Sequence, residues 1–300
     1  MTRLSAWLNA FRLRTLPLAI SGILLGSMLA YADGYFRLPV LFLAISTAVL
    51  LQIISNLAND YGDAVKGADN KDRVGPKRAI QSGAISKIAM KRGIIITSGL
   101  TFIVGLRLLY VAFYPINLLY LLVFLAIGIL SIAAAIKYTM GKNPYGYRAL
   151  GDAFVFIFFG WIAVLGVYFL YSSQLDPIIF LPASSIGFLS VAVLNLNNMR
   201  DAIQDEKVGK ITLPVKLGVQ NSHRYHLFLL SMAFVTASIF AVLKYQISPA
   251  LSFLILLPLI FIHLKKVFSV SPIELNPELK KIALLTLAFS ILLGLGSIFG

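Results

Sequence analysis

Long apolar segments alternate with short polar segments along almost the whole chain. A helix that crosses a membrane needs roughly 20 mostly apolar residues. Nine segments come near or exceed that length: 17–35, 39–58, 94–113, 118–136, 152–171, 178–196, 227–245, 249–264 and 282–299. The seventh and eighth are the weakest, because Pro249 and Pro258 interrupt them. The pattern predicts an all-α, polytopic membrane protein of about nine transmembrane helices, forming one domain over 1–300 and keeping its first helix uncleaved.

Composition agrees with this pattern. The chain is 59% apolar and only 13% charged, whereas soluble domains contain about 25% charged residues. It has no cysteine, which excludes disulfides and thiolate metal sites. The net charge of +14 would suggest nucleic acid as a partner of a soluble protein. In a membrane protein it reflects topology instead, so we expect a lipid bilayer and no nucleic acid.

The basic residues predict the orientation. If the N-terminus is cytoplasmic, 23 of the 26 Lys and Arg residues lie on the cytoplasmic side, and only Arg37, Arg107 and Lys244 lie outside. Such an excess is typical of cytoplasmic loops. The acidic residues have the same bias, since only Asp33 and Asp176 fall outside. Charges of both signs are therefore concentrated on one face.

Two acidic segments follow apolar helices on that face. The first, "SNLANDYGDAVKGADNKDR", begins at Ser55, and the second, "VLNLNNMRDAIQDEKVGK", covers 193–210. Residues three, four and seven positions apart share one face of a helix. That spacing relates the polar residues within each segment: Asn56, Asn59, Asp60 and Asp63 in one, and Asn197, Asp201 and Asp205 in the other. Like charges on one face repel, so we expect cations to offset them.

Oxygen ligands without His or Cys favour Mg²⁺ or Ca²⁺ over zinc. Mg²⁺ commonly uses one or two carboxylates and completes its coordination with water and substrate phosphates. Two clusters that each hold one ion against a shared diphosphate fit this behaviour, with nearby bases neutralising the remaining charge. The simpler alternative is a pair of solvated loops with salt bridges. Charged groups at membrane depth are usually functional, which favours the first interpretation.

A third polar segment, "KYTMGKNPYGYRALGD", covers 137–152. Lys142 is one of its basic residues, and Tyr138 lies two positions after the end of the apolar segment 118–136. Tyr138 is either a cavity residue or a member of the aromatic belt at the membrane interface.

These segments resemble the UbiA superfamily of intramembrane prenyltransferases, which has an Asn/Asp-rich first motif and an Asp-x-x-x-Asp second motif. The residues that carry the resemblance are 51–86, 138–152, 158–166 and 193–218, together with "RTLPLA" at 14–19. The likeness is greatest to the branch that acts on naphthoate. Much of the superfamily has a further Asp four positions after Asp63, where this chain has Gly67, and the acid is displaced to Asp69.

The resemblance implies helices around a central cavity that opens to the cytoplasmic side, and it implies roles for particular residues. The catalytic set would be Asn59, Asp60, Asp63, Asp69, Asp201 and Asp205. All of these except Asp60 would hold Mg²⁺. Contacts to the diphosphate and the cavity would come from Arg73, Arg78, Tyr138, Lys142, Asn197, Asn198 and Arg200.

The implied reaction transfers a polyprenyl group from polyprenyl diphosphate to 1,4-dihydroxy-2-naphthoate, with loss of CO₂ and diphosphate, giving demethylmenaquinone. The implied location is the inner membrane of a bacterium, with the active site facing the cytoplasm. Two alternatives remain at this stage. The acceptor could be another ring such as 4-hydroxybenzoate, or the chain could be a cation-coupled transporter, because membrane-depth carboxylates also mark ion pathways.

Other features have simpler expected roles. His226 and His263 lack metal-ligand spacing, so we expect them to pack near the interface, and Glu278 to be a solvated loop charge. Five glycines are expected to permit close contact between helices: Gly99, Gly105, Gly128, Gly160 and Gly166.

Overall fold

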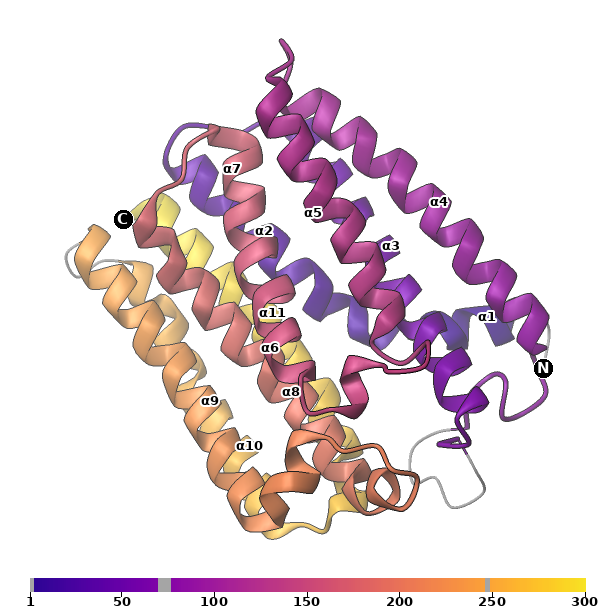
Figure 1. Ribbon diagram of the computed structural model, residues 1–300. Helices are drawn as coiled ribbons and strands as arrows, with labels where there is room; N and C mark the ends of the chain where they lie inside the picture. The colour runs from indigo at the N-terminus through magenta and orange to yellow at the C-terminus, as the bar shows by residue number, and fades with distance from the viewer. Residues whose placement is uncertain (1–2, 70–76, 246–248) are drawn as a thin grey trace.

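A computed structural model describes residues 3–69, 77–245 and 249–300 of the chain. The helices, shown in Figure 1, are α1 (Arg3–Phe11), α2 (Leu16–Ala32), α3 (Leu38–Val65), α4 (Lys87–Ala112), α5 (Leu118–Lys137), α6 (Gly151–Val155), a π-helical segment (Phe156–Gly166), α7 (Val167–Ser172), α8 (Phe180–Lys207), α9 (Leu213–Tyr245), α10 (Leu257–Ser269) and α11 (Asn276–Phe299). Short 3₁₀ turns join several of them, and no strand occurs among the described residues.

Nine helical stretches of the described chain are long and apolar enough to cross a membrane, which confirms the predicted all-α, polytopic fold. The two weakest predictions are among them, as Leu213–Tyr245 and Pro249–Ser269. Pro249 and Pro258 each fall within the first two residues of a helical element, 3₁₀ or α. Proline is tolerated there because the first backbone N–H groups of a helix have no partner within it.

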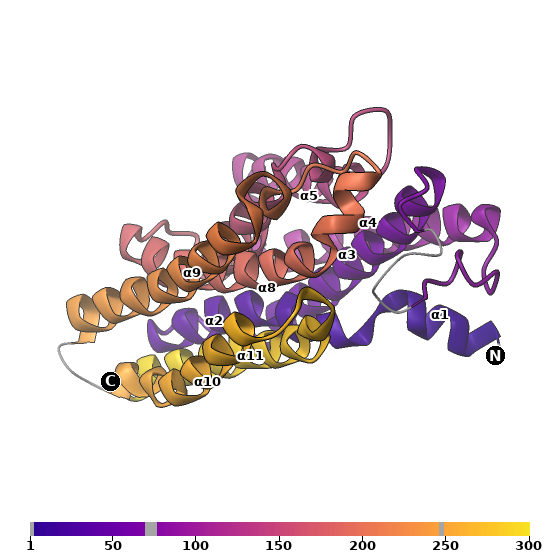
Figure 2. The same cartoon turned by 90° about the horizontal axis from the view of Figure 1, so that it is seen from below.

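The helices form two groups. Seen from below in Figure 2, α3, α4 and α5 lie on one side of the bundle and α9, α10 and α11 on the other. Both groups contact α2 or α8: α2 packs on α3 and α11, and α8 packs on α9 and α11. Helices α2 and α8 therefore lie between the two groups.

Glycines permit close approach at the centre of the bundle. A Cβ added at Gly26 would come 2.5 Å from the carbonyl oxygen of Val164, and one at Gly160 would come 2.7 Å from the Cα of Gly187. Such distances leave no room for a side chain, so the expected role of Gly160 in helix contact is confirmed. Three other predictions of this kind are wrong, because Cβ atoms at Gly99, Gly105 and Gly128 would meet nothing within 4 Å.

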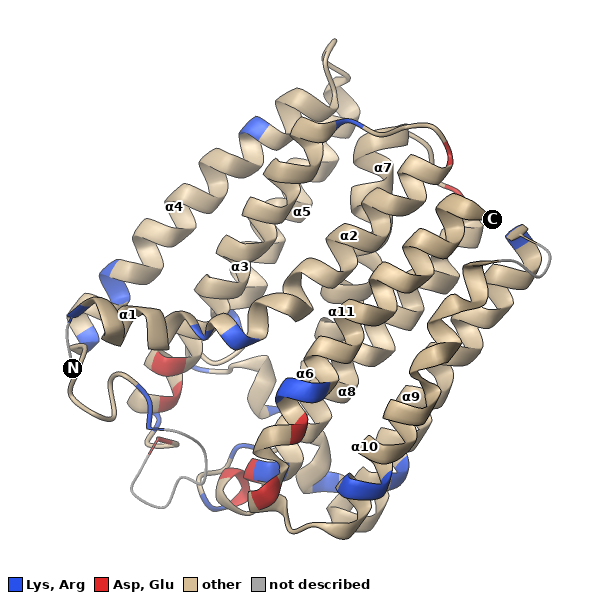
Figure 3. Cartoon of the chain, turned by 180° about the vertical axis from the view of Figure 1, so that it is seen from behind, with Lys and Arg blue, Asp and Glu red and all other residues tan. Residues whose placement is uncertain are grey.

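Charged residues gather at one end of the bundle, near α1 and the loops below α8 (Figure 3). The prediction that Glu278 is a solvated charge is wrong, because this residue is 1% exposed. Its carboxylate bonds to Nδ1 of His263 at 2.7 Å, and Nε2 of His263 lies 3.0 Å from Nε2 of His226. Buried charges are retained only when they are paired, and this chain of contacts joins α9, α10 and α11.

Candidate functional site

The two acidic segments meet at one small cavity. Asp63 lies two residues before the end of α3, and Asp205 lies two residues before the end of α8. Each helix ends two residues before a glycine in the left-handed region, Gly67 (φ 75°) and Gly209 (φ 70°). Because these turns close both helices at the same end of the bundle, the acids converge. The cavity is about 10 Å³ in volume, and its polar lining residues are Asp63, Asp69, Asp201, Gln204, Asp205, Arg78 and Lys210.

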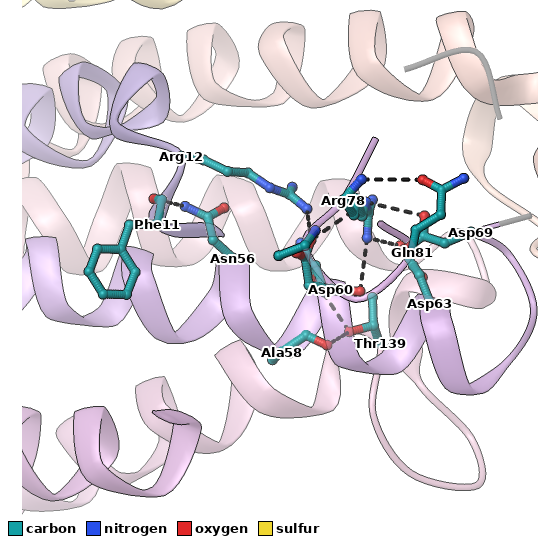
Figure 4. Close-up of polar contacts among 12 residues, drawn as sticks. Phe11, Arg12, Asn56, Ala58, Asp60, Asp63, Asp69, Arg78, Gln81 and Thr139 are labelled. Atoms are coloured by element: carbon teal, nitrogen blue, oxygen red, sulfur yellow. Dashed lines mark hydrogen bonds and ion pairs between the residues drawn. The ribbon is translucent and has the colours of Figure 1, made fainter. Parts of the chain in front are cut away.

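Arg78 organises the first cluster, which is drawn in Figure 4. Its Nη1 donates to Oδ2 of Asp63 at 2.7 Å and to the carbonyl oxygen of Asn59 at 2.9 Å, while Nε lies 3.2 Å from Oδ1 of Asp69. Burial disfavours the charged guanidinium, but the surrounding carboxylates outweigh it and raise the pKa of Arg78. The first cluster therefore carries a permanent cation among its acids.

The displaced acid of the first motif returns to this cluster. After α3 the chain turns at Gly67, and the backbone N–H groups of Ala68 and Asp69 both donate to the carbonyl oxygen of Asp63, at 2.9 and 3.4 Å. Glycine adopts this positive φ without steric cost. The turn places the carboxylate of Asp69 beside Arg78, so an acid six residues after Asp63 reaches the same small cavity.

Asp60 has different surroundings from Asp63. It is 1% exposed and accepts from Nη2 of Arg12 at 2.6 Å and from the backbone N–H of Ala79 at 3.3 Å. It is not among the residues that line the small cavity or the large one described below. Asp60 therefore fixes Arg12 and the segment around Arg78, and its position is that of a supporting residue.

The second cluster is built on α8 around Arg200. This guanidinium donates to both carboxylate oxygens of Asp201, at 2.7 and 2.6 Å, which is the bidentate geometry that Arg favours. It also donates to Oδ1 of Asn197 at 3.0 Å and to Oδ1 of Asn276 at 2.6 Å. Because Asn276 begins α11, Arg200 ties the second cluster to the last helix.

Two acceptors of the second cluster have no hydrogen-bond partner. Nζ of Lys210 lies 3.3 Å from Oδ1 of Asp205, but Oδ2 of Asp205 and Oδ1 of Asn198 are buried and unpaired. Burial opposes the charge on Lys210, yet Asp63 and Asp205 outweigh it and raise the pKa of this lysine. A buried acceptor without a partner costs roughly 1–3 kcal/mol, so these two oxygens are available to a ligand.

Tyrosines of the loop between α5 and α6 complete the site. The hydroxyl of Tyr147 donates to Oδ1 of Asp63 at 2.8 Å, and its ring lies 5.7 Å from Nζ of Lys210. Burial and the Asp63 carboxylate raise the pKa of Tyr147, which keeps it a donor. A bridge between Arg148 and Ile211, with the N–H of Ile211 donating to the carbonyl oxygen of Tyr147 at 3.3 Å, holds this loop against the segment after α8.

A second and much larger cavity, of about 920 Å³, adjoins the small one, and Asp63, Arg78 and Lys210 line both. Near the acids its wall is polar, with Asn59, Asn197, Asn198, Tyr138, Arg12 and Arg14. Farther along α3 it is lined by Leu51, Ala48 and Ala44. Asp63 and Ala44 are 19 residues apart, which is about 28 Å along a helix. A charged end thus leads into a long apolar space.

Sequence reasoning and structure differ for several site residues. The structure does not bring Lys142 to the site, because this side chain is exposed and absent from both cavity linings. Asp72 and Arg73 lie outside the described residues. Two residues were not predicted as site members, Arg12 and Tyr147, and Lys210 was expected only as one of the bases near the second acidic segment. The positions of these residues depend on how the loops fold back against the helices. Arg12 lies just before the motif at 14–19, and Lys210 lies within the motif at 193–218.

The small cavity fits a divalent cation by charge and by donor type. Its lining includes four carboxylates and two cations, a formal charge of minus two. The unpaired oxygen of Asp205, in this cavity, and that of Asn198, in the adjoining large cavity, are hard donors of the kind that Mg²⁺ prefers. No group of three His, Cys, Asp or Glu side chains in the described part of the chain is already arranged as a metal site, and Arg78, Lys210 and Arg200 are paired with the acids. A metal would therefore take over oxygens that these bases now contact.

The fold and the site together define a polytopic membrane protein that can hold a charged group at one end of a long apolar cavity. The model of the UbiA prenyltransferase family matches residues 19–284, and the chain belongs to this family. The 1,4-dihydroxy-2-naphthoate octaprenyltransferase of Escherichia coli K12 is 45% identical over 94% of this chain and 91% of its own length. The enzyme of that name from Haemophilus influenzae is 43% identical over 99% of this chain and 97% of its own length. The resemblance seen in the sequence is confirmed.

Solved structures agree with the fold. A UbiA homologue from Aeropyrum pernix K1 aligns with a TM-score of 0.65 at 19% identity, covering 99% of this chain and 98% of that one. A UbiA homologue from Archaeoglobus fulgidus bound to GPP and Mg²⁺ aligns with a TM-score of 0.61 at 17% identity, covering 96% of this chain and 99% of that one. At this identity the likeness shows a shared fold.

Proposed function

We propose that this protein transfers a polyprenyl group from polyprenyl diphosphate to 1,4-dihydroxy-2-naphthoate, releasing diphosphate and CO₂ and giving the prenylated naphthalenediol, which is the reduced (quinol) form of demethylmenaquinone. The observation that carries the proposal is the meeting of the α3 and α8 acids at the polar end of a cavity whose remainder is apolar. A diphosphate with a long hydrocarbon chain has the same division of charge. The names of the relatives from E. coli and H. influenzae support the choice of acceptor.

Mg²⁺ is the proposed cofactor, with Asn59, Asp63 and Asp69 as ligands on one side and Asp201 and Asp205 on the other. When bound, the metal would stabilise the negative charge that develops on the diphosphate as a Lewis acid. The UbiA homologue from Archaeoglobus fulgidus bound to GPP and Mg²⁺ supports this assignment. The unpaired Oδ2 of Asp205 supports it from within this chain.

Basic side chains would hold the diphosphate itself. Arg78 and Lys210 line both cavities and are charged, and Arg12 lines the large cavity next to them. If the metal takes over part of the carboxylate charge, these bases are free to donate to phosphate oxygens. Arg200 was expected to contact the diphosphate, but it lines neither cavity and contacts Asp201 through two bonds, so its proposed role is to orient that acid.

The cavity would protect the reacting carbon. Breaking the bond between the prenyl carbon and the diphosphate oxygen leaves an allylic cation, which water would capture. Tyr138 lines the cavity at its polar end and packs against the backbone of Gly146 and Gly151. With its burial raising the pKa of its phenol, Tyr138 is neutral and cannot itself trap the cation as a phenolate. A cavity that excludes water protects the allylic cation and so favours prenyl transfer over hydrolysis of the donor.

The acids of the cavity also favour the naphthoate over a hydroxybenzoate. When a ring carbon that bears a carboxylate attacks the prenyl cation, a new C–C bond forms to the prenyl group. The bond to the carboxylate then breaks, CO₂ leaves, and the electron pair of the broken bond restores the aromatic ring. No proton has to be removed from the ring carbon. An acceptor that loses a ring hydrogen needs a base, but the one acid among the described lining residues of the large cavity, Asp63, already accepts from Arg78 and Tyr147.

The proposed setting is the inner membrane of a bacterium, with the N-terminus and the active site on the cytoplasmic side. The distribution of Lys and Arg supports this orientation. The placement of the acids at helix ends also favours an enzyme over a transporter, because transporter sites are typically near the middle of the bilayer.

The test is a transfer assay with purified protein in liposomes, polyprenyl diphosphate, and either 1,4-dihydroxy-2-naphthoate or 4-hydroxybenzoate, with and without Mg²⁺. We expect diphosphate, CO₂ and prenylated product with the naphthoate only, and no product when Mg²⁺ is removed by a chelator. Product with the benzoate but not the naphthoate would contradict the choice of acceptor. Cation flux without diphosphate release would favour the transporter.

A further inference from the structure

Two glycines face the large cavity from neighbouring helices. Ten residues from Phe124 to Tyr138 on α5 line the cavity, and five of them, Phe124, Gly128, Ser131, Ala135 and Tyr138, follow one another at intervals of three and four. These five share one face of the helix. On α4 the lining residues Thr101, Gly105 and Leu108 do the same. Gly105 and Gly128 therefore lie on the cavity-facing sides of their helices.

Neither glycine is explained by helix packing. Cβ atoms added at Gly105 or Gly128 would meet nothing within 4 Å, in contrast to the tight contacts at Gly26 and Gly160. A glycine inside a helix is less favourable than alanine at the same position. Two glycines that face the open space of a cavity leave that space free of side chains, so that a ligand can occupy it.

The depth of these glycines is defined along α5. Gly128 is ten residues from Tyr138, which is about 15 Å along a helix from the polar end of the cavity. Phe124 lies one turn deeper, and its ring packs against those of Phe113 at 5.4 Å and Phe169 at 5.3 Å. A Cβ at Gly166, on the opposite wall, would lie 3.8 Å from the ring of Phe124. The cavity is thus open at the level of the two glycines, and the ring of Phe124 lines it one turn beyond them.

We propose that Gly105 and Gly128 form the passage through which the distal isoprene units of the donor extend, and so determine how long a prenyl chain the protein accepts. This inference rests on the proposed function and adds the length of the donor chain to it. A short donor such as geranyl diphosphate places its hydrocarbon between the acids and this passage. A longer donor has to continue between α4 and α5 at the level of the two glycines.

The test compares Gly105→Phe and Gly128→Phe with a control on α4, Gly99→Phe. Gly99 also has nothing within 4 Å of its Cβ position, but it is outside the cavity lining. It lies six residues from Gly105, or about 120° around the helix axis. The same bulk is therefore added to the same helix on a different face.

The measurement is kcat/KM for transfer from geranyl diphosphate and from a polyprenyl diphosphate with several more isoprene units. We expect the ratio of kcat/KM for the long donor to that for the short donor to fall at least about tenfold in Gly105→Phe and Gly128→Phe, since the distal CH₂ groups of the long donor can no longer be buried. Gly99→Phe keeps the wild-type ratio. An unchanged ratio in both cavity variants, or an equal fall in the control, overturns the proposal.

Binding of the same two donors, measured by competition with a fluorescent prenyl diphosphate, separates this proposal from the proposed function. If the wild-type protein binds the long donor tightly but transfers it to no acceptor, the proposed reaction is wrong, and weaker binding by Gly128→Phe still supports the passage. If wild-type protein transfers the long donor and both cavity variants match it in binding and in transfer, the passage is wrong and the reaction stands.

Discussion

Both ends of the bundle carry charged networks: the end where α3 and α8 finish, which is the inner end in the proposed orientation, and the opposite, outer end around Asp33 and Lys244. Among the described residues of these two networks, buried carboxylate and amide oxygens without a hydrogen-bond partner occur at the inner end. At the outer end Asp33 accepts from Lys244 at 2.7 Å and from Tyr168 at 2.7 Å. Arg37 donates to three carbonyl oxygens, those of Val111, Ala112 and Leu170, at 3.1, 3.0 and 2.6 Å. These carbonyls lie in the last turns of α4 and α7, where they have no partner within the helix.

The inner network differs in its surplus of acceptors. Four carboxylates and two cations line the small cavity, and Oδ2 of Asp205 and Oδ1 of Asn198 have no partner. A satisfied network holds helices together, whereas an unsatisfied one is prepared for a cation or a donor from outside the protein. Charge at a helix end is therefore not by itself a sign of function, and the unpaired oxygens are the distinguishing feature.

The largest effect is expected from a matched pair of substitutions, Asp63→Asn at the inner end and Asp33→Asn at the outer end. Asp63→Asn should lower the rate of prenyl transfer by at least about 100-fold, the size of loss seen when a group that stabilises developing charge is removed. Asp33→Asn should leave the rate unchanged. Both rates are measured in liposomes containing equal amounts of inserted protein. Equal rates for the two variants would remove the distinction between the ends.

A smaller effect is expected for Asp60→Asn, because Asp60 supports Arg12 and the segment of Arg78 without lining a cavity. The KM for polyprenyl diphosphate should rise about tenfold, equivalent to ~1.4 kcal/mol, with kcat much less affected. Steady-state kinetics separates the two parameters. A loss confined to kcat would show that Asp60 acts in the chemical step.

Tyr147→Phe should have a modest effect, since it removes one hydrogen bond to Asp63 and keeps the ring next to Lys210. A hydrogen bond of this kind contributes about 1 kcal/mol, so we expect kcat/KM to fall about fivefold. Tyr145→Phe is the control, because its hydroxyl bonds to a backbone carbonyl of α5. Similar losses in both variants would indicate a general effect on the loop.

The smallest effect on transfer is expected for Lys244→Met, which breaks the outer network. The rate should be unchanged, and the free energy of unfolding should fall by roughly 1–2 kcal/mol, between the values typical of exposed and of buried ion pairs. Thermal unfolding in detergent measures this change. A loss of transfer without a loss of stability would connect the outer end to the reaction.

Much of the fold follows from the sequence because the membrane restricts it so strongly. Every backbone polar group in the apolar part of a bilayer must be paired, so long apolar segments become helices, and the described part of the chain contains nine of them. Local spacing likewise placed Asn59 and Asp63 on one face of α3. The π-helical form of Phe156–Gly166 was not predictable, because apolar residues on all sides give no periodic signal.

The remaining parts of the site depend on contacts between distant segments. Tyr147 reaches Asp63 across 84 positions, and no local pattern encodes that distance. The carboxylate of Glu278 looked solvated because lysines follow it closely in the sequence, yet it is buried and bonds to His263 of α10, which in turn contacts His226 of α9. The glycines of α4 and α5 looked like packing residues, and only the cavity distinguishes Gly105 and Gly128 from Gly160.

The most direct measurement is an experimental structure with Mn²⁺ in place of Mg²⁺ and a non-hydrolysable polyprenyl diphosphate analogue, with the metal located by its anomalous signal. The account predicts metal bound between α3 and α8, with oxygen ligands from Asp63 or Asp69 and from Asp201 or Asp205, and the diphosphate bridging the two clusters. Metal bound by one cluster alone, or a diphosphate that contacts neither, would contradict it.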